Sequence, residues 1–278
     1  ADLVVHASPL YHFTINAAMK TFIERTLPVL QPFLISYGGE TVHPLRHKHP
    51  HMAFLSVAGF PEMSVFDQLS SWANFIYGRV GMLTAEIYRP NAEVLTVPAF
   101  RHKAAEVLDA TRQAGREIVL QSKVSPGTMA AVTRDLVEDR KLFHEVTNIM
   151  WKTCLEQGLS PAELIDRKIV PVPRTIRDFQ KFMRFAFNPG GAEGLKAVVQ
   201  FDFTGSPEGS CHFIIDGGRI EASDGPAPHP DVTVASDFGL WMDIMAKKKD
   251  GGQMFLEGKY QARGDLDLLL RRNGLFGQ

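Results

Sequence analysis

The sequence has few of the features that mark a specialised class of protein. It contains only two cysteines, Cys154 and Cys211, among 278 residues. Two cysteines are too few for a disulfide framework or for a zinc or iron–sulfur site built from thiolates. Two free thiols are typical of a reducing compartment, so we expect a cytoplasmic protein.

Strong charge and long apolar runs are also lacking. The 30 Lys and Arg residues nearly balance the 31 Asp and Glu residues, which leaves a formal net charge of -1. This balance gives no electrostatic indication of a nucleic-acid partner. No segment approaches the roughly 18 consecutive apolar residues of a transmembrane helix. No signal peptide is recognisable, although a chain that begins without Met can have lost an upstream segment.

The composition that remains is that of an ordinary globular protein, 45% hydrophobic and 22% charged. In its first part, residues 3–7 and 52–57 are short apolar runs without alternation, as in strands covered on both faces. Residues 82–90 form a third strand that ends at Pro90. A helical pattern follows each strand, which predicts a parallel sheet with helices on its faces.

The middle of the chain is helical and contains no strand pattern. Gly158 ends a long helix, and Ser160 and Glu163 have the spacing of a capping box that begins the next one. Pro171 and Pro173 then form a stiff, non-helical segment that suits a domain linker.

After this linker, short strands between residues 197 and 236 alternate with Gly, Pro and Asp turns, and helical patterns follow. This order predicts an α+β module. We therefore expect three parts: a first domain at 1–124, a connector at 125–173 and a second domain at 174–278.

The opening residues, "SPLYHFTINAAMKTFIERT", resemble a loop and helix of the flavodoxin-like NAD(P)H-dependent FMN reductases and quinone reductases. Glu24 replaces the Asp that is more usual there, and "SVAGFPE" is similar to the glycine-containing loop after the next strand in those families. The positions that match the loop and helix are Pro9, Tyr11, Lys20, Phe22, Ile23 and Arg25.

This resemblance implies that the first strand is the third of a five-stranded sheet in the order 2-1-3-4-5. The sheet given is then incomplete at its N-terminal side, and its first two strand–helix units carry the phosphate-binding loop. Because proteins avoid a long apolar sheet edge, we expect an upstream or separately supplied segment to complete it. The alternative is a remnant half-domain.

Ligands of doubly wound sheets lie beyond the carboxyl ends of the strands. The resemblance therefore implies an FMN cofactor at this edge, reduced by NAD(P)H, if the upstream phosphate-binding segment is present. Because the flavin carries the hydride, no catalytic side chain is assigned. The alternative interpretation is that the Pro-Leu-Tyr segment only ends a strand and begins a helix. The implied cofactor contacts are Ser8, Pro9, Leu10, Tyr11, His12, Phe13, Ala58, Gly59 and Phe60.

The last part of the chain resembles the sterol-carrier-protein type-two lipid-binding domain. The matching positions, in order, are Gln200, Phe201, Gly205, Asp231, Trp241, Phe255, Gly258, Lys259, Gly264, Asp265 and Phe276. The resemblance implies a hydrophobic tunnel between the sheet and the helices that holds a lipid, fatty acyl or sterol-like molecule. An ordinary filled core is the alternative. The side chains expected to line the tunnel are Phe201, Phe213, Leu240, Trp241, Ile244, Met245, Met254 and Phe255.

Two other clusters have less specific interpretations. "HPLRHKHPH" places four histidines in one loop, but no Cys or acidic ligand is nearby, so we expect a solvated loop and no metal site. "AKKKDG" is expected to be a solvated turn. An acyl-CoA phosphate or a membrane surface is the alternative partner for its three lysines.

The predicted fold class is thus a partial α/β flavodoxin-like parallel sheet followed by an α+β sterol-carrier-like domain. It favours an FMN-dependent NAD(P)H oxidoreductase fused to a hydrophobic-ligand-binding domain. The alternative is a non-enzymatic lipid or fatty-acyl-CoA carrier with a scaffold in front. The residues identify neither the lipid nor the electron acceptor, and they leave the oligomeric state open, although reductases of this kind often form homodimers.

Overall fold

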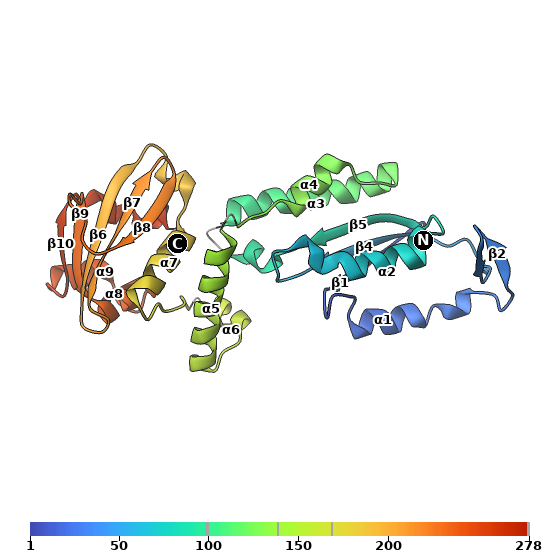
Figure 1. Cartoon of the computed structure of the whole chain (residues 1–278), viewed down its shortest axis with the longest axis horizontal. Helices are drawn as coiled ribbons and strands as arrows, with labels where there is room; N and C mark the ends of the chain where they lie inside the picture. The colour runs from blue at the N-terminus through green and yellow to red at the C-terminus, as the bar shows by residue number, and fades with distance from the viewer. Residues whose placement is uncertain (98–99, 138, 168, 277–278) are drawn as a thin grey trace. The chain divides into compact units, whose positions relative to one another are not determined.

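The computed structural model describes residues 1–97, 100–137, 139–167 and 169–276 (Figure 1). The chain forms two compact units, Ala1–Glu138 and Asp139–Gln278. Within the described ranges, no helix is both long enough and apolar enough to cross a lipid bilayer.

The first unit is built on a parallel sheet of three strands in the order β1-β4-β5, which confirms the predicted parallel sheet. Its assignment as flavodoxin-like stays a prediction. A short antiparallel hairpin, β2–β3, which the sequence analysis did not anticipate, lies in the connection between β1 and β4. The strands are β1 (Leu3–Pro9), β2 (Ile35–Tyr37), β3 (Glu40–Val42), β4 (His51–Val57) and β5 (Leu83–Arg89).

Helices cover both faces of this sheet. On one face, α2 (Asp67–Ala73) packs over Phe54 of β4. On the other, α3 (Arg101–Gln121) and α4 (Pro126–Thr133) pack over Ala85 of β5. The remaining helices of this unit are α1 (Ala17–Glu24), η1 (Leu27–Val29), η2 (Met63–Phe66), η3 (Asn74–Gly78) and η4 (Ala92–Thr96).

Strand β1 differs in one respect from the sequence-based expectation of burial on both faces. It forms the edge of the sheet, and Val5 at its centre is 52% exposed. The opposite face of β1 is covered, because His6 is buried against the ring of Phe54 at 5.3 Å.

The second unit begins with helices whose ends follow the sequence signals. Asp139 accepts the N–H of Leu142 at the start of α5, and Gly158 ends that helix with a φ of 63°. Ser160 and Glu163 form the predicted capping box, each accepting the other's backbone N–H, at 3.3 Å and 2.8 Å. These helices are α5 (Arg140–Gln157), α6 (Pro161–Asp166), α7 (Ile176–Ala186) and η6 (Pro189–Ala192).

A five-stranded sheet in the order β10-β9-β6-β7-β8 follows, with β6 and β9 parallel and the other neighbours antiparallel. The strands are β6 (Lys196–Thr204), β7 (Gly209–Asp216), β8 (Arg219–Asp224), β9 (Val232–Asp237) and β10 (Gln261–Gly264). The helices are α8 (Phe238–Met245), α9 (Gly251–Leu256), α10 (Asp267–Leu270) and α11 (Arg272–Leu275). This is the predicted α+β architecture.

Aromatic side chains fasten α7 to one face of this sheet. Phe179 of α7 is fully buried. Its ring makes edge-to-face contacts with Phe201, Phe203 and Phe213 at centroid distances of 5.1, 5.2 and 5.7 Å. Such contacts stabilise a pair by about 0.5–1.5 kcal/mol beyond burial, so this cluster fixes the position of α7.

Candidate lipid-binding site

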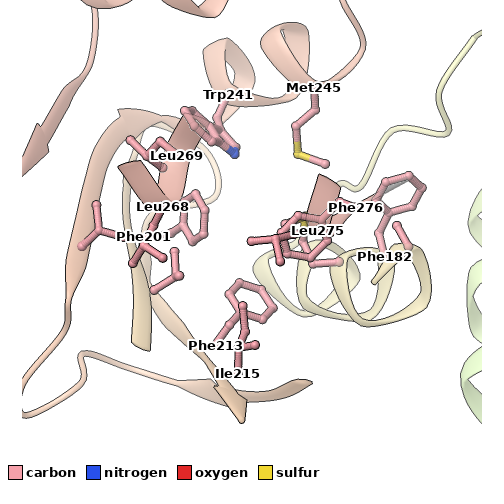
Figure 2. Close-up of a pocket in the computed structure, with 14 residues that line it drawn as sticks. Phe182, Phe201, Phe213, Ile215, Trp241, Met245, Leu268, Leu269, Leu275 and Phe276 are labelled. Carbon is pink, nitrogen blue, oxygen red and sulfur yellow. The ribbon is translucent and has the colours of Figure 1, made fainter. Parts of the chain in front are cut away.

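An apolar cavity of about 50 Å³ lies between the second sheet and its helices (Figure 2). Strands β6, β7 and β9 form one wall, and α7, α8 and the C-terminal helices α10 and α11 form the others. Every lining side chain is hydrophobic: Phe182, Met183, Ala186, Val199, Phe201, Phe213, Ile215, Val232, Trp241, Met245, Leu268, Leu269, Leu275 and Phe276. A cavity of this character excludes charged groups and retains apolar ones.

Strand alternation explains why the sheet presents this wall. Side chains two residues apart point to the same face of a strand. Phe213 and Ile215 of β7 therefore both face the helices and are buried, whereas Ile214 between them is 40% exposed.

Helix periodicity explains which side chains of α8 form the opposite wall of the cavity. The carboxylate of Asp237 accepts the N–H of Leu240 at 2.9 Å and fixes the start of α8. Trp241 and Met245 are four residues apart, so both lie on the side of α8 that faces the cavity (Figure 2).

The structure brings together four of the eight side chains predicted to line a tunnel. Phe201, Phe213, Trp241 and Met245 all line the cavity. Their role in binding a lipid stays a prediction.

The other four do not line it. Ile244 is buried in the adjoining core, and Leu240 and Met254 pack against that core. Phe255 is 38% exposed, with its ring 5.5 Å from that of Tyr260.

The sequence analysis missed the contributions of α7 and of the C-terminal helices. In α7, Phe182, Met183 and Ala186 have the i, i+1, i+4 spacing of one helical face, which was a usable signal. Leu275 contributes from a helix of only four residues, too short for any periodicity to be read.

A polar hollow lies on another side of α7, towards α5 and β8. Two of its cations are paired with carboxylates of α5 or its N-cap: Lys181 lies 3.5 Å from Glu145, and Arg184 lies 3.1 Å from Asp139. These pairs link α5 to α7 at the surface, where each contributes little to stability.

The loops predicted to contact FMN lie at one edge of the first sheet. Pro9 of β1 is in register with Val57 of β4, so the segments after the two strands are neighbours. Tyr11, Phe13 and Phe60 in these segments are 61%, 46% and 62% exposed. The structure therefore places three solvent-accessible aromatic rings on the paired loops.

Several of the other predicted flavin contacts already form hydrogen bonds within the protein. Ser8 is buried and its hydroxyl accepts the N–H of Asn16 at 3.2 Å, while Leu10 and Ala58 donate their N–H groups to neighbouring strands. His12 has a left-handed φ of 48°. Gly59 follows Ala58 in the second loop.

One residue at this edge was not singled out from sequence. Arg89 at the end of β5 is buried, and its Nη1 donates to the carbonyl oxygens of Val132 and Arg134 at 3.0 Å and 2.7 Å. Burial lowers the pKa of the Arg89 guanidinium below its ordinary value. Its two acceptors lie at the end of α4, so Arg89 holds that helix against the sheet.

Two histidines of the histidine-rich segment contact backbone carbonyl oxygens. Nδ1 of His43 contacts the carbonyl oxygen of Phe33 at 3.0 Å, and Nδ1 of His49 contacts that of Pro50 at 2.8 Å. In the part of the chain that the structure describes, no three His, Cys, Asp or Glu residues gather as metal ligands.

Comparison with known proteins finds a family match within the second unit. Residues 186–277, about a third of the chain, match the model of the SCP-2 sterol transfer family. The match covers β6 to β10 and helices α8 to α11, but only the last residue of α7. No curated protein matches the sequence.

Similar solved structures include sterol carrier protein 2-like 2 from Aedes aegypti. Its crystal structure is 22% identical and covers 34% of this chain and 87% of its own, with a TM-score of 0.28. The solution structure of the palmitated mosquito protein is 25% identical over 36% of this chain and 89% of its own, with a TM-score of 0.30.

A stereoselective inverting sec-alkylsulfatase from a Pseudomonas species is 16% identical and covers 66% of this chain, with a TM-score of 0.36. The chain spans about a third of that enzyme's length, because the match covers 32% of it. All these TM-scores are below 0.5, so the family match to residues 186–277 is the finding that bears on the second unit.

Proposed function

We propose that the second unit is a carrier domain that binds a long-chain, lipid-like molecule between its sheet and its helices. The observation that carries this proposal is the cavity, because all fourteen lining side chains are hydrophobic. The match to the SCP-2 sterol transfer family supports it, because it covers the sheet and helices α8 to α11.

The small size of the cavity determines how a long-chain ligand enters it. Ligand pockets usually have volumes of about 300–1,000 Å³, whereas this one has about 50 Å³. A long chain therefore enters only if lining side chains move. Met183 and Met245 suit this because methionine adapts its shape with little strain.

The C-terminal end of the chain is the wall that opens most easily. Helices α10 and α11 have four residues each, and helices this short have little stability of their own. Two hydrogen bonds tie α11 to Asn188, whose N–H donates to the Leu275 carbonyl oxygen at 2.7 Å and whose Nδ2 donates to that of Gly274 at 3.0 Å. We expect these bonds to hold the backbone while the Leu275 and Phe276 side chains give way to the ligand.

Titration with a fluorescent fatty acyl ester tests this function. The matched variants are Ile215→Phe, which adds a ring inside the cavity, and Ile214→Phe, which adds the same ring on the exposed face of β7. We expect Ile215→Phe to bind the ester at least about tenfold more weakly, while Ile214→Phe binds it like the original protein.

Equal binding by both variants would exclude the cavity as the binding site. Circular dichroism checks that each variant is folded. If Ile215→Phe does not fold, Ala186→Leu fills the same cavity from α7 and takes its place.

A second candidate function concerns the first unit, which we infer to be an FMN-dependent NAD(P)H oxidoreductase. The exposed rings of Tyr11, Phe13 and Phe60 favour it, because together they offer flat surfaces that fit an isoalloxazine ring. When bound, FMN supplies hydride transfer between NAD(P)H and an electron acceptor. A non-enzymatic scaffold is the alternative.

Flavin binding separates these alternatives. We expect the protein to retain FMN through gel filtration when the upstream phosphate-binding segment is supplied, and a Tyr11→Ala variant to lose it while its circular dichroism is unchanged. A colourless protein that takes up no added FMN would leave only the carrier function.

A further inference from the structure

The connection between α1 and β4 forms a ribbon-like arm, residues 27–46, whose two halves pair with each other. Leu30 and Leu45 form an antiparallel bridge. The Gln31 N–H donates to the Pro44 carbonyl oxygen at 2.8 Å, and β2 and β3 continue the pairing towards the tip. No residue of the arm is buried, and Figure 1 shows its hairpin beyond the end of the parallel sheet. The arm is therefore held by its own hydrogen bonds and adds nothing to the core of the first unit.

Large apolar side chains are concentrated on this arm. Isolated apolar side chains are normal on a protein surface, whereas a contiguous group of them marks a site that contacts another molecule or a membrane. The group lies within residues 27–37, and its side chains are between 39% and 66% exposed: Leu27, Val29, Phe33, Leu34, Ile35 and Tyr37. The arm is therefore a candidate contact surface.

The pairing of β2 with β3 gives the hairpin an apolar face and a polar face. Side chains two residues apart on a strand share a face, so Ile35 and Tyr37 point the same way. Val42 is in register with Ile35 and joins them, because directly paired residues share a face. Ser36 and Thr41, which are also in register, point the other way. The hairpin is therefore amphipathic, although no part of this protein's core covers its apolar face.

The charged groups of the arm and its two ends are mainly cations. Residues 25–51 contain Arg25, Arg46 and Lys48, and Glu40 is the one acidic residue among them. Within the part of the chain that the structure describes, none of these three cations forms an ion pair with a carboxylate, and Glu40 itself lies 4.0 Å from Arg79. The partner that complements this surface is therefore apolar and anionic. A second copy of the arm does not complement it, because it would bring like charges together.

An anionic lipid bilayer has both of the required properties. A peripheral segment with an apolar face and basic residues buries its apolar side chains at the boundary between headgroups and acyl chains, and its cations are attracted to the anionic headgroups. The backbone limits the depth, because unpaired N–H and C=O groups at the edges of a two-stranded ribbon are strongly unfavourable in hydrocarbon. Only side chains therefore enter, and Tyr37 suits the headgroup level, where tyrosine is enriched.

We propose that the arm docks the first unit on an anionic lipid bilayer, with the apolar face of the hairpin in the interfacial region and the three cations against the headgroup phosphates. This inference goes beyond the two proposed functions and depends on neither of them. It gives the proposed carrier domain, on the same chain, a means of staying close to a source of lipid.

Flotation of the full chain with lipid vesicles tests the proposal. One set of vesicles is phosphatidylcholine, and the other contains equal amounts of phosphatidylcholine and phosphatidylserine. The matched variants are Ile35→Asn and Ser36→Asn, which place the same neutral side chain on the apolar and the polar face of β2. We expect the original protein to bind the anionic vesicles and not the neutral ones. Ile35→Asn should bind at least about tenfold more weakly, which is the factor that burial of an isoleucine side chain supplies, and Ser36→Asn should bind like the original.

A second pair of variants tests the charge. Lys48→Gln removes one of the three cations, and Lys152→Gln removes an exposed cation of α5 in the second unit. A lysine close to an anionic membrane contributes a factor of about fivefold to binding. Lys48→Gln should therefore weaken binding by about that factor, Lys152→Gln should not, and added salt should weaken binding of the original protein.

A fluorescent label covers the case in which Ile35→Asn disturbs the hairpin. Cys154 and Cys211 are 1% and 0% exposed, so a cysteine introduced on the arm is the thiol that reacts with the label. Ile35→Cys and Ser36→Cys are each labelled with the environment-sensitive fluorophore NBD. Anionic vesicles should raise the fluorescence of the label at position 35 and leave that at position 36 nearly unchanged.

Three results would overturn the proposal. The first is an original protein that does not float with anionic vesicles. The second is equal binding by Ile35→Asn and Ser36→Asn, together with equal responses of the two labels. The third is a dimer, seen by sedimentation equilibrium, that ignores vesicles and becomes a monomer in Ile35→Asn, because a second copy then covers the arm. None of these results bears on ligand binding in the cavity, which the Ile215→Phe variant tests separately.

Discussion

Two isoleucine substitutions in β9 should have opposite effects on the stability of the second unit. Val232 and Val234 are both 0% exposed, and both point to the helix-covered face of the sheet. Val232 lines the cavity, whereas Val234 belongs to the filled core beside it. Val232→Ile therefore adds a methylene group to empty space, and Val234→Ile adds the same group where the space is occupied.

The expected magnitudes follow from the volume of the cavity. At about 24 cal/mol per Å³, a cavity of about 50 Å³ lowers the free energy of unfolding by about 1.2 kcal/mol. One more buried methylene contributes about 0.8 kcal/mol, so Val232→Ile should raise that free energy by roughly 1 kcal/mol. Overpacking costs about 1–3 kcal/mol, so Val234→Ile should lower it by that amount.

Urea unfolding followed by tryptophan fluorescence measures both effects. Trp72 and Trp151 are replaced by Phe in the reference protein and both variants, so that Trp241, which is buried in this unit, is the sole reporter. The midpoint should rise for Val232→Ile and fall for Val234→Ile at an unchanged slope. Equal destabilisation by both variants would show that residue 232 is packed as tightly as residue 234, and that the cavity offers no usable space.

Three further predictions concern other parts of the chain. Burial lowers the pKa of His6 below its ordinary 6.5. The free energy of unfolding of the first unit should therefore have its full value above pH 6.5 and decrease as the pH falls through the lowered folded-state pKa of His6. Urea midpoints should show this decrease in the original protein and not in His6→Leu. Cys154 is 1% exposed, and burial raises the pKa of Cys211 to about 12, so both thiols should react with Ellman's reagent only after unfolding; a thiol that reacts rapidly in the folded protein would contradict this. Gly264 has a φ of 100°, and a Cβ there would lie 2.1 Å from the Asp231 carbonyl oxygen. Gly264→Ala should therefore lower the melting temperature more than Gly217→Ala does. A Cβ at Gly217 meets no neighbouring atom, so Gly217→Ala loses only about 1–2 kcal/mol of stability, from its left-handed backbone. Equal melting temperatures would show that β9 and β10 separate without cost.

The elements that could be predicted are those whose signals are local. The apolar run from Met52 to Val57 and the glycine and proline residues around it are enough to indicate a buried strand. Strand β10 has no such signal. It is four residues long, and Ala262 is its only partly buried side chain, so its place in the sheet depends on pairing with β9.

The cavity could be predicted only in part, for a related reason. Helix α8 is apolar on nearly every side, so its composition does not indicate which face meets the cavity. The structure selects Trp241 and Met245 and turns Ile244 into the adjoining core. Leu275 reaches the cavity from the end of the chain, a long-range contact that no local pattern predicts.

The small volume of the cavity also bears on which ligands the proposed carrier can hold. Leu275 is 2% exposed and Phe276 is partly buried, and moving a fully buried side chain of this size into water costs about 1.5–3 kcal/mol. Displacing both therefore costs at most about 3–6 kcal/mol, which a ligand offsets at about 0.8 kcal/mol for each methylene it buries. About four to eight methylene groups are needed before binding gains anything, so short chains are excluded by energy and not by shape. Beyond that length the apolar wall treats all chains alike, because every side chain that lines the cavity is hydrophobic.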